Sequence, residues 1–146
     1  MLIKILQIAL PFVWFGLVGG ISFFEAPLKF RAPNITLALG LGIGKLVFFW
    51  LNKIEIALAF LLLVSFSFVK PEKNLALILF GFIALLLTLQ TVWLLPALNA
   101  RAAAVISESF AASSKTHFIY IALEVLKFIS LFALGAELAK SYLKFD

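Results

Sequence analysis

The third apolar stretch of the chain, residues 75–98, reads LALILFGFIALLLTLQTVWLLPAL and contains no charged residue. At 1.5 Å per residue a helix of this length measures ~36 Å, which exceeds the ~30 Å of a bilayer's hydrocarbon core. A membrane β-barrel would instead need many segments of ~10 residues in strict apolar–polar alternation. The stretch therefore predicts a transmembrane helix.

Three further apolar runs of similar length lie on either side of it, at residues 5–28, 45–69 and 117–138. Four spans with short connections use the whole chain of 146 residues. We therefore expect one transmembrane domain, 1–146, folded as an all-α, up-down-up-down four-helix bundle. The first run is too long for a signal-peptide core, and we interpret it as a retained span.

The composition agrees with a chain that lipid covers. Hydrophobic residues make up 64% and charged residues 13%, and the mean hydropathy is +1.17, whereas soluble domains are about 25% charged. We expect a multi-pass protein of a bacterial inner membrane, with the bilayer as its first partner. Basic residues outside the spans are balanced between the two sides, so the positive-inside rule predicts no orientation.

Several chemistries lack the residues that they need. The chain has no cysteine and one histidine, which excludes thiolate metal sites and bis-histidine haem within one chain. No serine within the predicted spans has a histidine at helical spacing, and no phosphate-cradling glycine motif is present. The sequence has no basic cluster with interleaved aromatic residues, so it does not predict nucleic-acid binding. We therefore predict no cofactor, no metal and no set of catalytic residues.

Polar residues gather in one half of the predicted bundle, where the first and third helices end and the second and fourth begin. The other half, apart from flanking lysines, is almost purely aliphatic and phenylalanine-rich. The polar residues of the first half are Glu25, Lys29, Lys45, Asn52, Glu55, Gln90, Asn99, Arg101, His117, Glu124 and Lys127.

Helical spacing places many of these residues in stripes, and a stripe of polar groups should turn away from lipid. The second helix carries Lys45, Asn52 and Glu55 on one face. The same helical spacing places Gln90 and Trp93 on one face of the third helix. The stripe of the fourth helix consists of His117, Tyr120, Glu124 and Lys127.

Depth makes the charges on these stripes informative. Glu55 and Lys127 lie about ten residues, or ~15 Å, inside their predicted helices, close to the bilayer midplane. An unpaired charge there costs several kcal/mol, so we expect Lys127 to pair with Glu55 or Glu124, with Gln90 in the same network. Such a network either only holds the helices together or forms a ligand or proton site. The candidate site residues are Glu55, Glu124, Lys127, Asn52, Gln90, Tyr120 and His117.

Two local features carry their own predictions. Glu25 and Lys29, four residues apart at the membrane interface, should form an ion pair at the end of the first helix. Gly16, Gly19 and Gly20 should allow a neighbouring helix to approach closely.

Short motifs on all four predicted helices resemble the transmembrane protein two-hundred-five family, small four-helix membrane proteins of unknown function. The segment TLQTVWLLP, residues 88–96, is similar to that family's third-helix pattern of Thr, then Asn or Gln, then Trp-Leu-x-Pro. The matching features elsewhere are ARAAA at residues 100–104, KLVFFWL at 45–51, His117, and Trp14 with Gly16. The resemblance implies a four-helix bundle but no reaction, and the chain departs from it in carrying Glu55, Glu124 and Lys127.

A weaker resemblance concerns the second helix. Lys45 followed by Asn52 and Glu55 is similar to the Arg-x6-Asn-x-x-Glu pattern of the membrane-associated eicosanoid and glutathione metabolism family. That family forms trimers of four-helix chains of about this length, with the site in the corresponding half of the bundle. The flanking arginines that hold glutathione are missing here.

Three functions are compatible with these observations. The first is transport or permeation of a proton, a cation or a small amphipathic molecule. The second is a structural or accessory subunit. For the assembly of the chain, we expect either a homo-oligomer or a larger membrane complex. The third is a membrane enzyme acting on a lipophilic substrate near Asn52, Glu55 and Tyr120. A solvent-open cavity reaching Glu55 would favour the first or third over the second.

Overall fold

The computed structural model describes residues 1–107 and 115–143, and every regular element in these ranges is helical. The all-helical class predicted from the sequence is therefore confirmed for the described part of the chain. The helices join into four long rods, each long and apolar enough to cross a membrane: Leu2–Arg31, Leu37–Phe68, Asn74–Ile106 and Thr116–Leu143.

Two of the rods are single α-helices and two are composite. The second and fourth rods are α3 (Leu37–Phe68) and α6 (Thr116–Leu143). The first rod consists of α1 (Leu2–Val18), the π-helix η1 (Gly19–Glu25), α2 (Ala26–Leu28) and the 3₁₀-helix η2 (Lys29–Arg31). The third consists of α4 (Asn74–Leu89), the π-helix η3 (Gln90–Leu94) and α5 (Leu95–Ile106).

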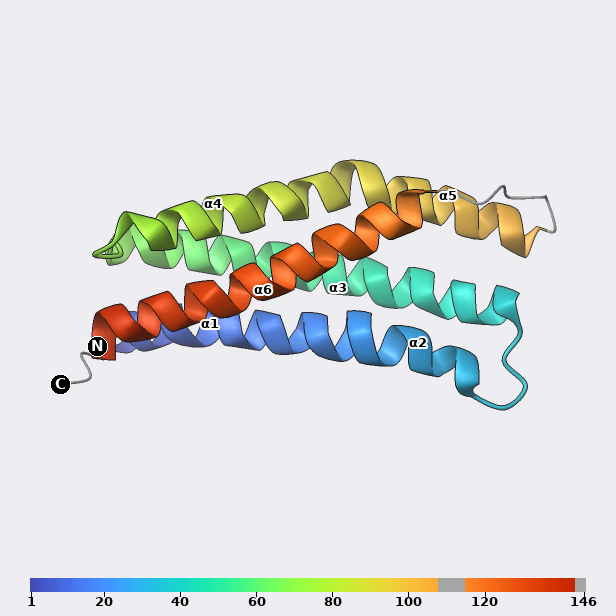
Figure 1. Cartoon of the computed structure of the whole chain (residues 1–146), viewed down its shortest axis with the longest axis horizontal. Coiled ribbons are helices and arrows are strands. Elements are labelled where there is room, and N and C mark those ends of the chain that lie inside the picture. The colour runs from blue at the N-terminus through green and yellow to red at the C-terminus, as the bar shows by residue number, and fades with distance from the viewer. Residues whose placement is uncertain (108–114, 144–146) are drawn as a thin grey trace.

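Consecutive rods run in opposite directions, so the beginning of α1 and the end of α6 lie at the same end of the molecule (Figure 1). At the opposite end, α3 and α5 continue past the beginning of α6 (Figure 1). We call the end that holds the beginning of α1 the closed end, and the other the open end.

The rods are longer than the sequence predicted. The second begins at Leu37 rather than near Lys45, because the Thr36 hydroxyl caps it by accepting a hydrogen bond from the Leu39 amide at 3.2 Å. The glycine-rich segment 40–44 therefore lies inside the helix and not before it. The third rod continues to Ile106, through the alanine-rich residues 100–104, which are good helix formers.

A proline follows each of the two π-helices. Pro27 comes two residues after η1 and Pro96 two residues after η3. A proline has no N–H, and its ring clashes with the carbonyl four residues earlier, so it favours a wider or kinked preceding turn. Before Pro27 and Pro96 the turn widens into a π-helix and the rod continues, whereas Pro11 lies within the α-helix α1.

The π-helix η3 overturns one predicted stripe. Gln90 and Trp93 do not share a face, since Gln90 is 1% exposed and Trp93 is 55% exposed. The prediction assumed α-helical spacing, and this spacing does not hold across a π-helix. Leu94 takes the buried position in place of Trp93.

The glycines of the first rod do not all serve helix packing. A Cβ at Gly19 would lie 3.0 Å from the ring of Phe128 on α6, so this glycine permits a close contact. At Gly16 and Gly20 a Cβ would meet nothing within 4 Å in the described part of the chain. The prediction of close packing is therefore wrong for Gly16 and Gly20 within this chain, because they lie on its outer face.

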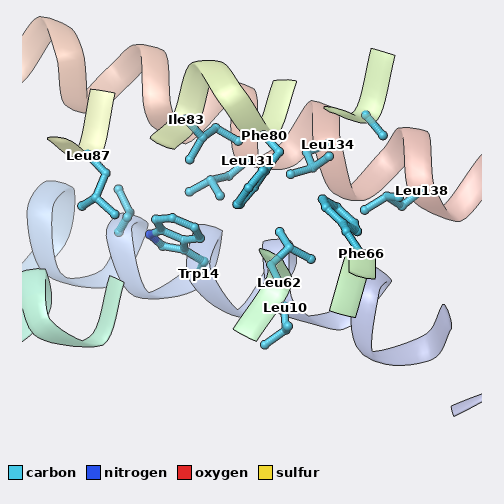
Figure 2. Packing of buried hydrophobic residues seen from close by; sticks show 12 residues of the cluster. Leu10, Trp14, Leu62, Phe66, Phe80, Ile83, Leu87, Leu131, Leu134 and Leu138 are labelled. Atoms are coloured by element: carbon cyan, nitrogen blue, oxygen red, sulfur yellow. The ribbon is translucent and has the colours of Figure 1, made fainter. Parts of the chain in front are cut away.

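The hydrophobic core lies between all four rods toward the closed end (Figure 2). Leu62 of α3, Ile83 of α4, and Leu131 and Leu134 of α6 are fully buried. Trp14 of α1 packs into the same cluster, with its indole ring among the aliphatic side chains (Figure 2). The core fixes the relative positions of the rods just below the polar half.

The closed half is not purely apolar, contrary to the sequence interpretation. Gln7 of α1 is fully buried and donates hydrogen bonds from Nε2 to the carbonyls of Ser65, at 2.9 Å, and Val69, at 2.8 Å. Its Oε1 accepts a hydrogen bond from the Tyr142 hydroxyl. The Ser65 carbonyl also accepts from the Val69 amide at 3.0 Å, so Gln7 adds a second hydrogen bond there and binds the Val69 carbonyl just after the end of α3.

Candidate functional site

Lys127 of α6 is the centre of a buried polar network. Its side chain is 0% exposed. The ammonium contacts Oε1 of Glu55 on α3 and lies 2.9 Å from Oε2 of Glu124 on α6. It also donates to Oε1 of Gln90 in η3 at 2.7 Å. An ammonium has three protons to donate, and these three oxygens account for all of them.

Glu124 receives donors on both of its oxygens. Gln90 donates from Nε2 to Oε2 at 2.6 Å, and Ser22 of η1 donates its hydroxyl to Oε1 at 2.6 Å. Gln90 therefore accepts from Lys127 and donates to Glu124, which makes it the bridge between the third rod and α6. Both η1 and η3 supply a side chain to this carboxylate, so the two π-helices meet at the network.

Glu55 is held from the other side by the hydrophobic core. Trp14 donates from its indole nitrogen to Oε1 of Glu55 at 2.8 Å. The same oxygen contacts Lys127. Trp14 thus belongs to the core through its ring and to the network through its N–H, a division typical of buried tryptophans.

The ionised network carries one excess negative charge. Glu55 and Glu124 contribute two carboxylates and Lys127 one ammonium, and these groups are almost completely buried. Gln90, Trp14 and Ser22 add neutral donors to the carboxylates. All four rods contribute at least one member, so the network ties the bundle together at one level.

A cavity of about 670 Å³ opens above the network, between the two composite rods, α3 and α6 toward the open end. Glu124, Ser22 and Tyr120 form its inner end, and Glu55 and Lys127 lie outside it. Its apolar wall includes Phe23, Phe30, Leu37, Leu41, Phe48, Leu95, Leu98, Val105 and Ile121. Its basic lining consists of Lys29, Lys45, Arg101 and His117.

The remaining predicted site residues take different places. Tyr120 is buried, and its ring packs edge-on against Phe48 with centroids 5.7 Å apart. His117 is exposed and lines the cavity one turn farther out. Asn52 belongs to neither group, because it donates to the hydroxyl of Thr91 at 2.8 Å and so links α3 to η3.

Lys29 enters the cavity wall from the end of the first rod. Its side chain is 9% exposed, and its ammonium lies 3.3 Å from Oε2 of Glu25, the pair that the spacing of these residues predicts. The ammonium also lies 5.6 Å from the ring centre of Phe48. A Cβ at Gly44 would come within 3.1 Å of this nitrogen, so the absence of a side chain on α3 makes room for the charge.

Sequence reasoning missed Trp14 and Ser22 as members of the network. A stripe of Gln7, Leu10, Trp14, Val18 and Ser22, spaced by three or four residues, marks the inner face of the first rod. That spacing was available in the sequence. The stripe contains no charged residue, and buried charge is the feature that distinguishes the other members of the network in the sequence.

Within the described ranges no group of three or more His, Cys, Asp or Glu side chains is placed to hold a metal ion. Comparison of the chain with protein-family models, with curated proteins and with solved structures finds no match.

Proposed function

We propose that this protein is an integral membrane protein that binds a small amphipathic molecule in the cavity at the open end and transports it. The observation that carries the proposal is the cavity of about 670 Å³ beside the buried network. Pockets for small molecules measure roughly 300–1,000 Å³ and are mostly apolar with a few polar groups. The size and the lining of this cavity both fall within that description.

The lining supports an amphipathic molecule over a proton or an inorganic cation. A cation would meet Lys29, Lys45 and Arg101, and the acidic Glu124 at the inner end is already paired with Lys127. A proton path through the bundle would need access to Glu55, which is 2% exposed and in contact with Lys127 and Trp14. A molecule with an apolar part and a polar part fits the mixed wall.

The network supports the cavity from below. It joins all four rods at the level of Ser22 and Glu124, which are also lining residues. In this proposal the network is the inner end of the binding site, and transport requires the packed half below it to open. Ser22 and Glu124 both hold the bundle and line the cavity, whereas Glu55, Gln90 and Lys127 hold the bundle without lining it.

The experiment uses the absence of native cysteine, since any introduced thiol is then unique. Ala102→Cys places one in the cavity wall. Ala100→Cys, two residues away on α5, places one on an exposed face outside the lining. Both variants are reconstituted in phosphatidylcholine nanodiscs, and the rate of their reaction with N-ethylmaleimide is measured with and without monolauroylglycerol, dodecanoate and dodecyltrimethylammonium.

At least one of these twelve-carbon amphiphiles should slow the reaction of Ala102→Cys while leaving that of Ala100→Cys unchanged. Such a difference would locate the amphiphile in the cavity. If all three leave both rates unchanged, or slow both variants equally, the cavity does not bind amphiphiles and the proposal is wrong.

A further inference from the structure

We propose, building on the amphiphile site of the preceding section, that the molecule bound in the cavity carries an anionic head group, recognised by Lys29 and Lys45. This inference deepens the proposed function, because it assigns the chemical class of the substrate. It rests on the placement of these two lysines in the cavity wall.

The charged side chain of Lys29 is fixed in position by the residues around it. Its side chain is 9% exposed and packs beside the ring of Phe48, with its nitrogen in the space left by Gly44. Its recorded ion-pair partner is Glu25, whose nearer oxygen is 3.3 Å away. An ammonium can donate three hydrogen bonds, so Lys29 keeps donors for a ligand that enters the cavity.

Lys45 adds a second charge at the same turn of α3. It follows Gly44 directly and lines the cavity, and it forms no ion pair with any residue that the structure describes. Lys29 and Lys45 therefore both line the cavity at the level of residues 44 and 45 of α3, and they come from two different rods. Arg101 of α5 also lines the cavity. Glu124 is the acidic lining residue, and Lys127, Gln90 and Ser22 already occupy its oxygens.

The level of these lysines matches that of lipid head groups. Residues 46–68 of α3, which follow Lys45, form ~35 Å of helix, enough to match the hydrocarbon thickness, and include the buried Asn52 and Glu55 and the exposed Lys53. Lys45 then stands at the boundary, where lysines meet the head-group layer. Farther in, Phe48, Leu95 and Ile121 line the cavity at the depth of acyl chains. Leu37, Leu41 and Phe30 line the cavity on the outer side of Lys45. The lysines therefore lie partway along the wall, and the apolar residues on their inner side form the place for the chain of a single-chain anionic amphiphile.

The test compares head groups on one chain length. Protection of Ala102→Cys from N-ethylmaleimide is titrated in phosphatidylcholine nanodiscs with dodecanoate, dodecyl phosphate, monolauroylglycerol and dodecyltrimethylammonium, and with inorganic phosphate. Ala100→Cys reports any change of the bilayer itself. Dodecanoate and dodecyl phosphate should protect at concentrations about tenfold lower than the neutral and cationic amphiphiles. Inorganic phosphate should not protect at those concentrations.

Substitution of a lysine tests whether the preference for anionic head groups comes from the cavity wall. Lys45→Gln in the Ala102→Cys background should raise the half-protecting concentration of dodecanoate about tenfold and leave that of monolauroylglycerol unchanged. Lys45 is exposed and unpaired in the described part of the chain, so this variant should fold. Lys53→Gln is the matched control, since Lys53 is an exposed lysine of the same helix outside the cavity lining.

The outcomes separate the inference from the proposed function. Equal protection by anionic, neutral and cationic amphiphiles would contradict the preference for an anionic head group, but it would still support the binding of amphiphiles. Equal effects of Lys45→Gln and Lys53→Gln would also overturn it. Protection by inorganic phosphate as strong as that by dodecyl phosphate would make the ligand a free anion and overturn an amphipathic substrate. Protection by none of the probes would overturn the proposed function itself.

Discussion

Lys127 is the residue whose removal should disturb the molecule most, because two buried carboxylates depend on its charge. Lys127→Met leaves Glu55 and Glu124 negative in the centre of the bundle, and breaking a buried pair in this way costs about 3–5 kcal/mol. Glu55→Gln or Glu124→Gln leaves one carboxylate paired with Lys127, so either should cost clearly less. The thermal midpoint of unfolding in detergent measures all three, and an unchanged midpoint for Lys127→Met would contradict the account.

The double variants identify the carboxylate that needs Lys127 more. Without Lys127, Glu124 keeps hydrogen bonds from Gln90 and Ser22, whereas Glu55 keeps that from Trp14. Glu55→Gln should therefore recover more of the stability lost in Lys127→Met than Glu124→Gln does. The difference between the two double variants is read from their thermal midpoints. Better recovery by Glu124→Gln would assign the greater dependence to Glu124.

At the scale of residues, the sequence predicts charged members of the site better than neutral ones. Glu55 and Lys127 stand out because a charge deep in an apolar helix is costly and must find a partner. Trp14 and Ser22 give no such signal, since tryptophan and serine occur at many positions in membrane helices. Their part in the network depends on which side chains face them across the bundle, and one helix alone does not contain that information.

At the scale of elements, the number and class of the helices follow from hydropathy, and their lengths and local forms do not. Apolar runs mark where lipid covers a helix, but α3 begins at Leu37, before the predicted run 45–69, and α5 continues to Ile106, after the predicted run 75–98. Both extensions lie beside the cavity. The π-helices η1 and η3 come from Pro27 and Pro96, and they change which residues face inward. The mistaken pairing of Gln90 with Trp93 is the direct result.

The contact between η2 and α3 can be tested at Gly40. A Cβ at this position would overlap the ring of Phe30, whereas a Cβ at Gly42 would meet nothing within 4 Å in the described chain. Gly40→Ala should lower the free energy of unfolding by about 1–3 kcal/mol, the usual cost of overpacking. Gly42→Ala, the control, should leave it unchanged or raise it slightly, because alanine favours helix. Chemical denaturation in detergent measures both.

A second substitution checks the cause of that loss. In a Phe30→Ala background the ring is absent, so Gly40→Ala should no longer destabilise the protein. If the loss persists in this background, it comes from the helix itself and not from the contact with the end of the first rod.

At the scale of the whole molecule, the bundle divides into a packed half and a hollow half. The core around Trp14, Leu62 and Leu131 fills the closed end, and the cavity occupies the open end, with the network at the boundary between them. The sequence shows this division as an uneven distribution of polar residues. It does not show that the polar half is hollow, because a cavity depends on how far apart the rods stand, which hydropathy does not record.

If the hollow half carries a substrate, closing it should stop movement of that substrate between leaflets. Ala102→Trp adds a large ring to the cavity wall, and Ala100→Trp adds the same ring to an exposed face of α5 outside the lining. Vesicles containing each variant are loaded with a fluorescent nitrobenzoxadiazole-labelled lysophosphatidic acid, and dithionite then bleaches the label in the outer leaflet alone. The wild-type chain and Ala100→Trp should expose inner-leaflet label to bleaching with time, while Ala102→Trp should match protein-free vesicles. Equal rates for the wild type and Ala102→Trp would show that the molecule does not pass through the cavity. Equal thermal midpoints of the wild type and both variants would show that such a result does not reflect a general loosening of the bundle.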